Sequence, residues 1–512
     1  MGYRISRREF TRLLAGLPFL PMAGESLSND PLRRGTSISA PNILILVFDA
    51  LSAKHLSLHG YPRRTTPNLD RFAEQATVFH AHYSAGSYTT PGVASLFTGV
   101  YPWTHRALNL HGTVAHPYED RNLFSAFGPA GYHRVGFSHN LFVTSLMYQA
   151  RRHLDLLIPA RELCLSDDEL ADRLFPHDYN VAFWSEWILM RKGYSPPVSL
   201  FISLLDRVRR PRRQAVLEAE HRASFPRGLP TMHNLYFILE EAIDYILEST
   251  AQSPQPYLAY YHLLPPHEPY TARREFVGLF DDGWAPEPLP PGAFSGGHTQ
   301  ETLNRKRVEY DEYVAYVDAE FGRLIDTMSR TGALDNTMLI VTSDHGELFE
   351  RGIAGHMTPA LYDSLIRVPL IISRPGQRRR RDIHTPTSSV DLLPTLLQAS
   401  GQEAPDWCEG RVLPSFGPET NAGDRSLFVV EAKSNPKMAP LTKASIALIN
   451  GSRKLIHYLG YPECPDSWEL YDLTDDPGER HNQYSPSDPV AETLRSELEY
   501  RVNQATVALS EQ

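Results

Sequence analysis

Short, mostly apolar runs alternate along the chain with longer amphipathic stretches. Five such runs stand at residues 42–48, 134–137, 257–261, 338–342 and 368–372. A run of this length with no polar side is typical of a strand that is buried on both faces of a sheet. Between two of them, apolar residues recur every three or four positions from Tyr310 to Met328, and Gly332 follows, which predicts a helix. The alternation predicts an α/β fold with a large mixed, mostly parallel sheet flanked by helices.

Polar residues able to bind metals or anions follow the predicted strands. They are Asp49, His139, His262 with His267, and Asp344 with His345. The carboxyl ends of parallel strands share one edge of a sheet, and ligands bind there. We therefore expect these side chains to converge on one site.

Composition excludes several classes of protein. The 512 residues are 42% hydrophobic and 21% charged, as in a large globular protein, and the net charge of −10 disfavours a nucleic-acid partner. Three scattered cysteines (Cys164, Cys408 and Cys464) exclude a disulfide scaffold and a zinc ribbon. No apolar run approaches the roughly 20 residues of a membrane span.

The first 40 residues differ from the rest of the chain. Arg7 and Arg8, followed by Phe10 and a short apolar segment, are similar to a twin-arginine export signal. We expect residues 1–40 to be a signal and linker, and the protein to be exported to the periplasm or beyond the cytoplasm. The alternative is a basic N-terminus on a cytoplasmic protein.

Several segments, taken in their order along the chain, carry a family resemblance. They are PNILILVFDALSAKHLSLHGYPRRTTPNLD, SYTTPGVASLFTGVYP, YHLLPPHEPY, VTSDHGELFERGIAGH, SVDLLPTLL and ELYDLTDDPGERHNQ. Together they resemble the sulfatases of the alkaline phosphatase superfamily. The resemblance implies a catalytic domain over 41–403, with an insertion at about 150–250, and a smaller α+β subdomain over 404–512.

The resemblance fails at the nucleophile. Aligning Pro91 and Thr98 with the sulfatase signature, C/S-x-P-S-R followed by T-G, places Thr89 where the family has the Cys or Ser that is oxidised to formylglycine. Oxidation of the methyl-bearing carbon of threonine gives a ketone, so formylglycine is excluded. We expect Thr89 to lie just ahead of a helix that starts at Pro91, where the helix dipole suits an anion. The alternative is that Thr89 or Thr90 only caps this helix.

The resemblance also implies a metal site. We expect Asp49, Asp344 and His345, with the hydroxyl oxygen of Thr89, to hold one divalent ion, which is Mn²⁺, Ca²⁺, Mg²⁺ or Zn²⁺. This set is similar to that of phosphonate monoester hydrolases and of phosphoglycerol or phosphoethanolamine transferases. The alternative is that Asp49 has only a structural role, at the point where the chain enters a helix.

Four histidines complete the expected site. By the resemblance, His267 and His356 would stabilise the ester oxygens or protonate the leaving group. His139 and His262 are candidate substrate contacts, with His262 supporting another residue as the alternative. Arg367 is expected to anchor the sheet.

These expectations define a function. We predict a metal-dependent hydrolase or transferase that cleaves phosphate mono- or diesters through a covalent intermediate on Thr89. Its substrates would be anionic esters. The first alternative is a sulfuric ester hydrolase, and the second is an inactive protein that binds anions.

The region 150–250 carries no recognised motif. Within it, the apolar run at 198–205 leads into five arginines by residue 213, a pattern compatible with contact to a membrane surface or an anionic polymer. The alternatives are a core helix with a solvated basic end, and a lid over the site.

Overall fold

The computed structural model describes residues 40–165, 211–232, 235–417 and 425–510. Residues 40–512 form one compact unit, separate from residues 1–39. The predicted export signal lies outside the described residues, as does the 198–210 part of the predicted surface contact. Both stay predictions.

Eight strands of the described residues form the central sheet. In spatial order they are β13 (Arg381–Ile383), β2 (Thr77–Phe79), β12 (Leu370–Ser373), β9 (Thr337–Thr342), β1 (Asn42–Phe48), β8 (Tyr257–Leu263), β4 (His133–Ser138) and β5 (Leu156–Leu157). The run from β9 to β5 is parallel throughout, whereas β12 is antiparallel to both of its neighbours. The predicted mixed, mostly parallel sheet is confirmed, with all five predicted runs as strands.

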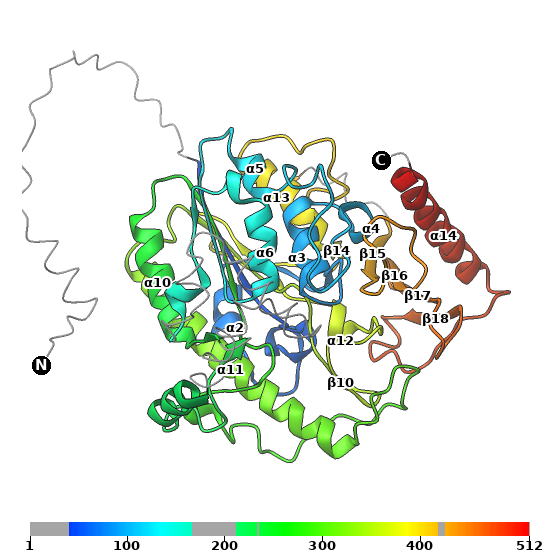
Figure 1. Cartoon of the computed structure of the whole chain (residues 1–512), viewed down its shortest axis with the longest axis horizontal. Coiled ribbons are helices and arrows are strands. Elements are labelled where there is room, and N and C mark those ends of the chain that lie inside the picture. Colours follow the sequence, from blue (N-terminus) through cyan, green and yellow to red (C-terminus); the bar gives the residue numbers. More distant parts are fainter. Residues whose placement is uncertain (1–39, 166–210, 233–234, 418–424, 511–512) are drawn as a thin grey trace, which may run out of the picture. The chain divides into compact units, whose positions relative to one another are not determined.

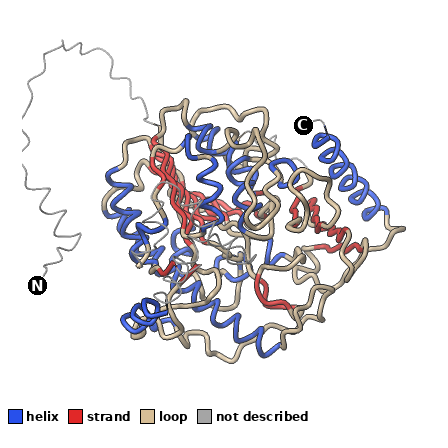
Figure 2. Tube along the Cα trace, in the orientation of Figure 1, coloured by secondary structure: helices blue, strands red, loops and turns tan. Residues whose placement is uncertain are grey.

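Helices cover both faces of this sheet (Figures 1 and 2). On one face, Leu44 and Leu46 belong to the core with α2 (Pro67–Ala73), α10 (Leu239–Gln252) and α11 (Gln300–Arg330). On the other, Ile43 and Ile45 pack with α3 (Thr89–Thr98), α5 (Leu123–Phe127), α6 (Leu141–Gln149) and α13 (Leu392–Ala399). Burial of both faces explains why β1 is apolar at every position from Ile43 to Phe48.

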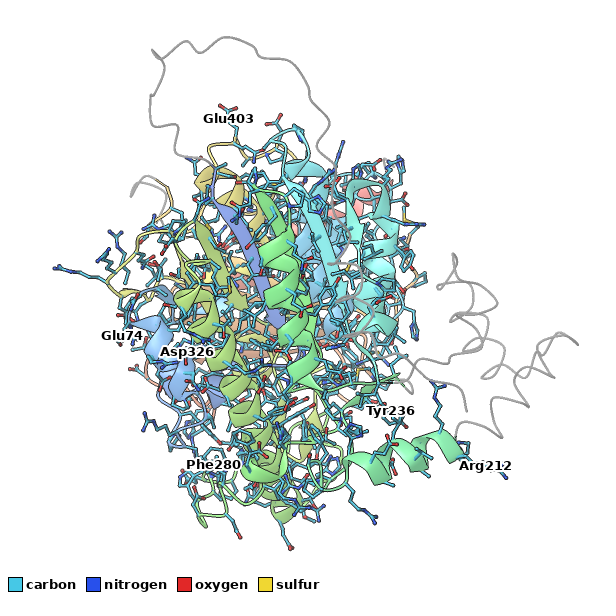
Figure 3. All side chains as sticks on the ribbon, turned by 90° about the vertical axis from the view of Figure 1, so that its left-hand side faces the viewer. Glu74, Arg212, Tyr236, Phe280, Asp326 and Glu403 are labelled. Carbon is cyan, nitrogen blue, oxygen red and sulfur yellow. The ribbon has the colours of Figure 1, made fainter. Side chains whose placement is uncertain are left out.

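The helix predicted around 310–328 is the central part of α11, which lies in front of the sheet in Figure 3. Its buried positions include Tyr310, Phe321 and Met328, as the periodicity required. Gly332 follows the end of the helix with a φ of +74°, a conformation that favours glycine. Within the described ranges, no helix is both long and apolar enough to cross a bilayer.

A second sheet stands near the C-terminus. Its four antiparallel strands are β15 (Leu427–Glu431), β16 (Ala444–Asn450), β17 (Arg453–Leu459) and β18 (Ser467–Asp472). Helix α14 (Pro489–Ser510) packs Leu494 and Leu498 into the core on one of its faces. This confirms the smaller α+β subdomain, while its boundary at residue 404 stays a prediction.

A buried ion cluster joins this sheet to α12 (Asp363–Ile366). Lys454 on β17 has no exposed surface, and its Nζ lies 2.9 Å from Asp363 Oδ1 and 2.6 Å from Glu479 Oε1. Asp363 is the first residue of α12 (Asp363–Ile366). Burial raises the pKa of Glu479 to about 7, against the opposing charge of Lys454.

Shorter elements complete the described residues. They are α4 (Pro102–His105) and the strand pairs β3 (His82–Tyr83) with β14 (Thr387–Ser388), β6 (Thr231–Met232) with β7 (Leu235–Tyr236), and β10 (Leu348–Glu350) with β11 (Ile353–Gly355). Residues 211–221 are helical, and Arg212 lies in this segment at the edge of the view in Figure 3.

Candidate functional site

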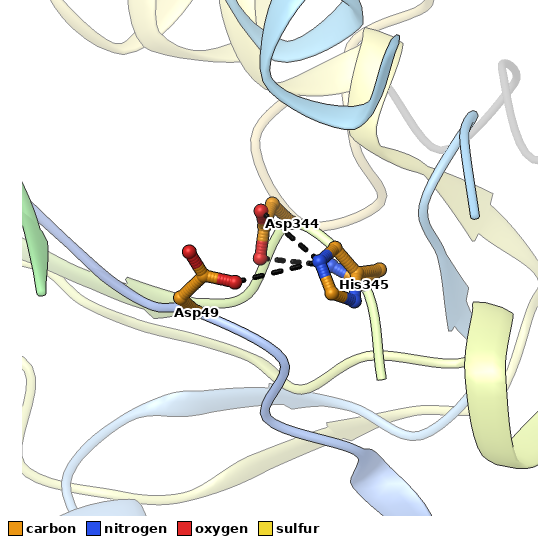
Figure 4. Close-up of side chains that lie close together, drawn as sticks. All are labelled: Asp49, Asp344 and His345. Carbon is orange, nitrogen blue, oxygen red and sulfur yellow. Dashed lines mark hydrogen bonds and ion pairs between the residues drawn. The ribbon is translucent and has the colours of Figure 1, made fainter. Parts of the chain in front are cut away.

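Three of the predicted metal ligands converge at the carboxyl edge of the parallel strands (Figure 4). Asp49 follows β1, and Asp344 and His345 follow the adjacent strand β9. All three side chains are buried, and one ligand atom from each lies within 4.8 Å of the others. His345 Nε2 is 3.4 Å from Asp49 Oδ1 and 3.6 Å from Asp344 Oδ2. The spacing is suited to a single ion.

Hydrogen bonds leave one oxygen of each of the two carboxylates unused. Asp49 Oδ2 accepts from His262 and Asn140, and Asp344 Oδ1 accepts from the backbone N–H groups of Ala50 and His345. Among the described residues, Asp49 Oδ1 and Asp344 Oδ2 have no hydrogen-bond donor. His345 Nδ1 donates to the Gly346 carbonyl, which directs Nε2 toward these oxygens. Two unpaired buried carboxylate oxygens beside an imidazole nitrogen fit a divalent cation.

The backbone is drawn tightly around this cluster. Ala50 adopts a φ of +61°, which is unfavourable for a residue with a side chain, and its N–H thereby reaches Asp344. Gly92 on α3 lies so near the Asp344 carbonyl that an added Cβ would come within 2.4 Å of that oxygen. Glycine at this position lets α3 approach the metal ligands.

Thr89 is the first residue of α3, two positions before the predicted helix start. Tyr88 is the N-cap, and no side chain caps the helix. The hydroxyl oxygen of Thr89 is instead 3.3 Å from His345 Nε2, while Thr90 donates to the Leu110 carbonyl. The geometry therefore contradicts the alternative in which Thr89 or Thr90 only caps the helix. Thr89 faces the metal ligands from the helix N-terminus, where unpaired N–H groups favour anions.

Two further histidines line the same site. The rings of His267 and His356 lie 4.7 Å apart, and that of His356 lies 4.4 Å from the ring of His345, measured between centroids. His356 Nδ1 contacts Glu347 Oε1 at 3.0 Å, and His267 Nδ1 donates to the Glu268 carbonyl. In both rings Nε2 is therefore left for a ligand. The structure brings both predicted histidines together.

The two candidate substrate contacts, His139 and His262, are both buried. His262 is within β8, which extends two residues beyond the predicted strand, and its ring is fully buried with Nε2 on Asp49 and Nδ1 on Tyr260. It supports Asp49 and has no nitrogen left for a substrate. His139 is also buried, its ring stacked on Phe237 at 4.1 Å between centroids, and burial lowers its pKa to about 3. The structure does not bring its ring to the metal ligands.

Sequence reasoning missed two residues of this site. Asn140, one position beyond His139, contacts both Asp49 and Thr89, and Glu347, two positions beyond His345, holds His356. The signal for Asn140 was present, because it follows a strand and precedes an apolar helix. Arg367 binds the His80 carbonyl and lies 3.8 Å from Asp363, as expected of a residue that anchors the sheet.

Comparison with known proteins agrees with this arrangement. Residues 41–159 and 178–402, more than half of the chain, match the family model Sulfatase, and residues 358–508 match the C-terminal model of N-sulphoglucosamine sulphohydrolase. The chain belongs to the sulfatase family.

Named relatives include proteins acting on different esters. The "Ulvan-active sulfatase" of Formosa agariphila is 25% identical over 92% of this chain and 82% of its own length. The choline-sulfatase of Rhizobium meliloti is 26% identical over 88% of this chain and 84% of its own length. The crystal structure of the phosphonate monoester hydrolase of Agrobacterium radiobacter superposes with a TM-score of 0.65 at 19% identity, covering 91% of this chain and 97% of that one.

Membership of the sulfatase family identifies the protein as an ester hydrolase of a family that generally depends on divalent metals. The electrostatics of the Asp–Asp–His cluster match this requirement. Burial lowers the pKa of His345, but Asp344 and Asp49 outweigh burial and raise it to about 10. Burial likewise acts to raise the pKa of Asp49, and the neighbouring His267, His262 and His345 lower it well below its usual range. The Asp49 carboxylate is thus kept charged and able to bind a cation.

Proposed function

We propose that the protein is a hydrolase of phosphate or phosphonate mono- and diesters that depends on one divalent metal ion and uses Thr89 as its nucleophile. Asp49, Asp344 and His345 would hold the ion, with Mn²⁺, Mg²⁺, Ca²⁺ and Zn²⁺ all compatible with two carboxylates and an imidazole. The ester's anionic oxygens would lie near the start of α3, His267 and His356.

The observation that carries the proposal is the identity and position of residue 89. A threonine hydroxyl faces the metal ligands at the place where sulfatase relatives oxidise Cys or Ser, with Oγ1 3.3 Å from His345 Nε2. Its methyl-bearing carbon cannot become an aldehyde. A free hydroxyl suits direct attack on phosphorus, which leaves a phosphothreonine that water can hydrolyse.

Each step can be assigned to a residue of this chain. A divalent ion supplies positive charge that lowers the pKa of an oxygen lying against it. Thr89 Oγ1, deprotonated, forms a bond to phosphorus while the bond to the leaving alcohol breaks, and the alcohol oxygen takes a proton from the imidazolium of His267 or His356. Water then attacks phosphorus, returns a proton to that imidazole, and releases the Thr89 alkoxide. The other product is phosphate from a phosphate monoester, a phosphate monoester from a diester, or a phosphonate from a phosphonate monoester.

Sulfuric ester hydrolysis is the second candidate. The names of the ulvan-active and choline relatives favour it, and the fold is shared. A threonine pathway for sulfate would require a sulfothreonine in place of the formylglycine intermediate. We place sulfate second because the chain lacks the residue from which formylglycine is made.

A substrate panel tests the proposal. The purified protein is given p-nitrophenyl phosphate, bis(p-nitrophenyl) phosphate, a p-nitrophenyl phosphonate and p-nitrophenyl sulfate, each with Mn²⁺, Mg²⁺, Ca²⁺ or Zn²⁺. We expect turnover of a phosphorus ester and little of the sulfate. Efficient sulfate turnover with no phosphorus ester turnover would contradict the proposal.

Variants at neighbouring positions supply the control. Thr89→Ala is expected to abolish turnover with the fold retained, and Thr89→Ser to keep measurable activity because a hydroxyl remains. Thr90→Ser is the matched control, since Thr90 lies beside Thr89 on α3 but binds the Leu110 carbonyl. Full activity in Thr89→Ala would reject the covalent route.

A further inference from the structure

We infer that Asn140 is an additional catalytic residue, which holds the nucleophile oxygen of Thr89 and stabilises the negative charge on it. The inference rests on the proposed role of Thr89. The hydrogen-bond donor to Thr89 is then an uncharged amide. The neighbouring His139 is not that donor, since its ring stacks on Phe237.

The orientation of the Asn140 amide is fixed by the chain. Asn140 is the N-cap of α6, and its Oδ1 accepts a hydrogen bond from the backbone N–H of Phe142 at 2.9 Å. A side-chain oxygen in that role is the normal N-cap arrangement. The Nδ2 group must therefore be the end that points into the site.

Both contacts of Nδ2 are with oxygens of the site. It lies 2.6 Å from Asp49 Oδ2 and 3.2 Å from Thr89 Oγ1. An amide NH₂ has two hydrogens, so it can donate to both oxygens at once. Asn140 thus links a metal ligand to the nucleophile and fixes the distance between them.

The surroundings make this donor rigid and dry. Asn140 has no exposed surface, its backbone N–H donates to Ser138 Oγ, and its carbonyl accepts the backbone N–H of Thr144. It therefore follows β4 and starts α6 with little freedom to move. A preorganised donor that is shielded from solvent stabilises a developing oxyanion more than a mobile donor does.

The chemistry favours an amide here. When Thr89 is deprotonated, and again when phosphothreonine is cleaved, negative charge resides on Oγ1, and the N–H of Asn140 stabilises that charge. The amide does not titrate, so this contribution is the same across the working pH range. The amide also cannot protonate the Thr89 alkoxide, as a charged histidine could.

Substitution of aspartate tests the donor while keeping the cap. In Asn140→Asp, one carboxylate oxygen still accepts from Phe142, but the atom facing Thr89 no longer donates. We expect kcat on the best phosphorus ester of the panel to fall by about 10²-fold or more, with KM changed little. Asn140→Ser, which keeps a cap oxygen without adding charge, should show the same loss of kcat. Metal content is measured in every variant, and rates are expressed per bound ion.

Asn122→Asp is the matched control. Asn122 caps α5 in the same way, accepting from Phe124 and Ser125, and its Nδ2 donates to the Glu119 carbonyl outside the site. It should keep the kcat of the unaltered protein.

The outcomes distinguish failure of the Asn140 role from failure of the proposed function. If Thr89→Ala is inactive but metal-loaded Asn140→Asp and Asn140→Ser both keep their kcat, the role of Asn140 is overturned and the proposed function stands. If Thr89→Ala stays fully active, the proposed function fails, and the role of Asn140 fails with it.

Discussion

The hydroxyl oxygen of Thr89 lies 3.3 Å from Nε2 of His345, although the two residues are 256 positions apart in the chain. One comes from the first turn of α3 and the other from the loop after β9. The short distance means that an ion held by His345, Asp49 and Asp344 would also lie close to the Thr89 oxygen.

Loss of one carboxylate should remove the metal. In Asp344→Asn the negative charge that faces His345 Nε2 is lost, so we expect bound Mn²⁺ to fall from about one ion per chain to well below one. Elemental analysis after dialysis measures this. Asp326→Asn, at an exposed position on α11 paired with Arg71, should still bind about one Mn²⁺ ion per chain. Unchanged stoichiometry in Asp344→Asn would exclude this site.

Metal affinity should depend on pH. Without metal, the pKa of His345 is raised to about 10, so at neutral pH its ring carries a proton that a cation must displace. The Mn²⁺ affinity of the metal-free protein should therefore rise as pH increases from 6 to 9, by at most about tenfold for each pH unit for one displaced proton. Titration calorimetry at several pH values measures it, and an affinity that does not change would contradict the assignment.

Replacing His267 should distinguish between leaving groups. If His267 protonates the departing oxygen, His267→Asn should slow cleavage of alkyl esters more than cleavage of p-nitrophenyl esters, since nitrophenolate leaves without a proton. Paired kinetics on a methyl and a p-nitrophenyl phosphodiester test this. His298→Asn provides a control on an exposed histidine. An equal loss on both esters would show that His267 only binds the substrate.

The buried Lys454 should be required for stability. Lys454→Met leaves the carboxylates of Asp363 and Glu479 buried without their cation, which costs about 3 kcal/mol of unfolding free energy. Arg453→Met, on the adjacent and half-exposed position of β17, removes only a surface pair with Asp472 and should cost about 1 kcal/mol or less. Urea unfolding compares the two, and equal losses would contradict the importance of the buried cluster.

Much of the fold could be predicted because its signals are local. The apolar run of β1 is continuous since both faces of the sheet are covered, and the apolar spacing in α11 matches its buried face. Asp49, Asp344 and His345 were found because each directly follows a strand of one parallel sheet, and such residues converge at one edge.

The missed features depend on tertiary contacts that no spacing encodes. His139 and Asn140 are adjacent after β4, and the sequence gives no reason why the histidine packs on Phe237 while the asparagine faces Asp49. His262 was assigned to the loop after its strand, but β8 extends two residues further and buries it. Helix α3 starts at Thr89, two residues before the predicted start at Pro91.

In the proposed mechanism, Thr89 becomes covalently phosphorylated during turnover. The most direct measurement is acid quenching of the metal-loaded protein during turnover of the best phosphorus ester, followed by peptide mass spectrometry. Phosphothreonine at position 89, absent from Thr89→Ala and formed normally in Thr90→Ser, is the predicted result. Rapid burst-phase turnover with an unmodified Thr89 at every quench time would contradict it.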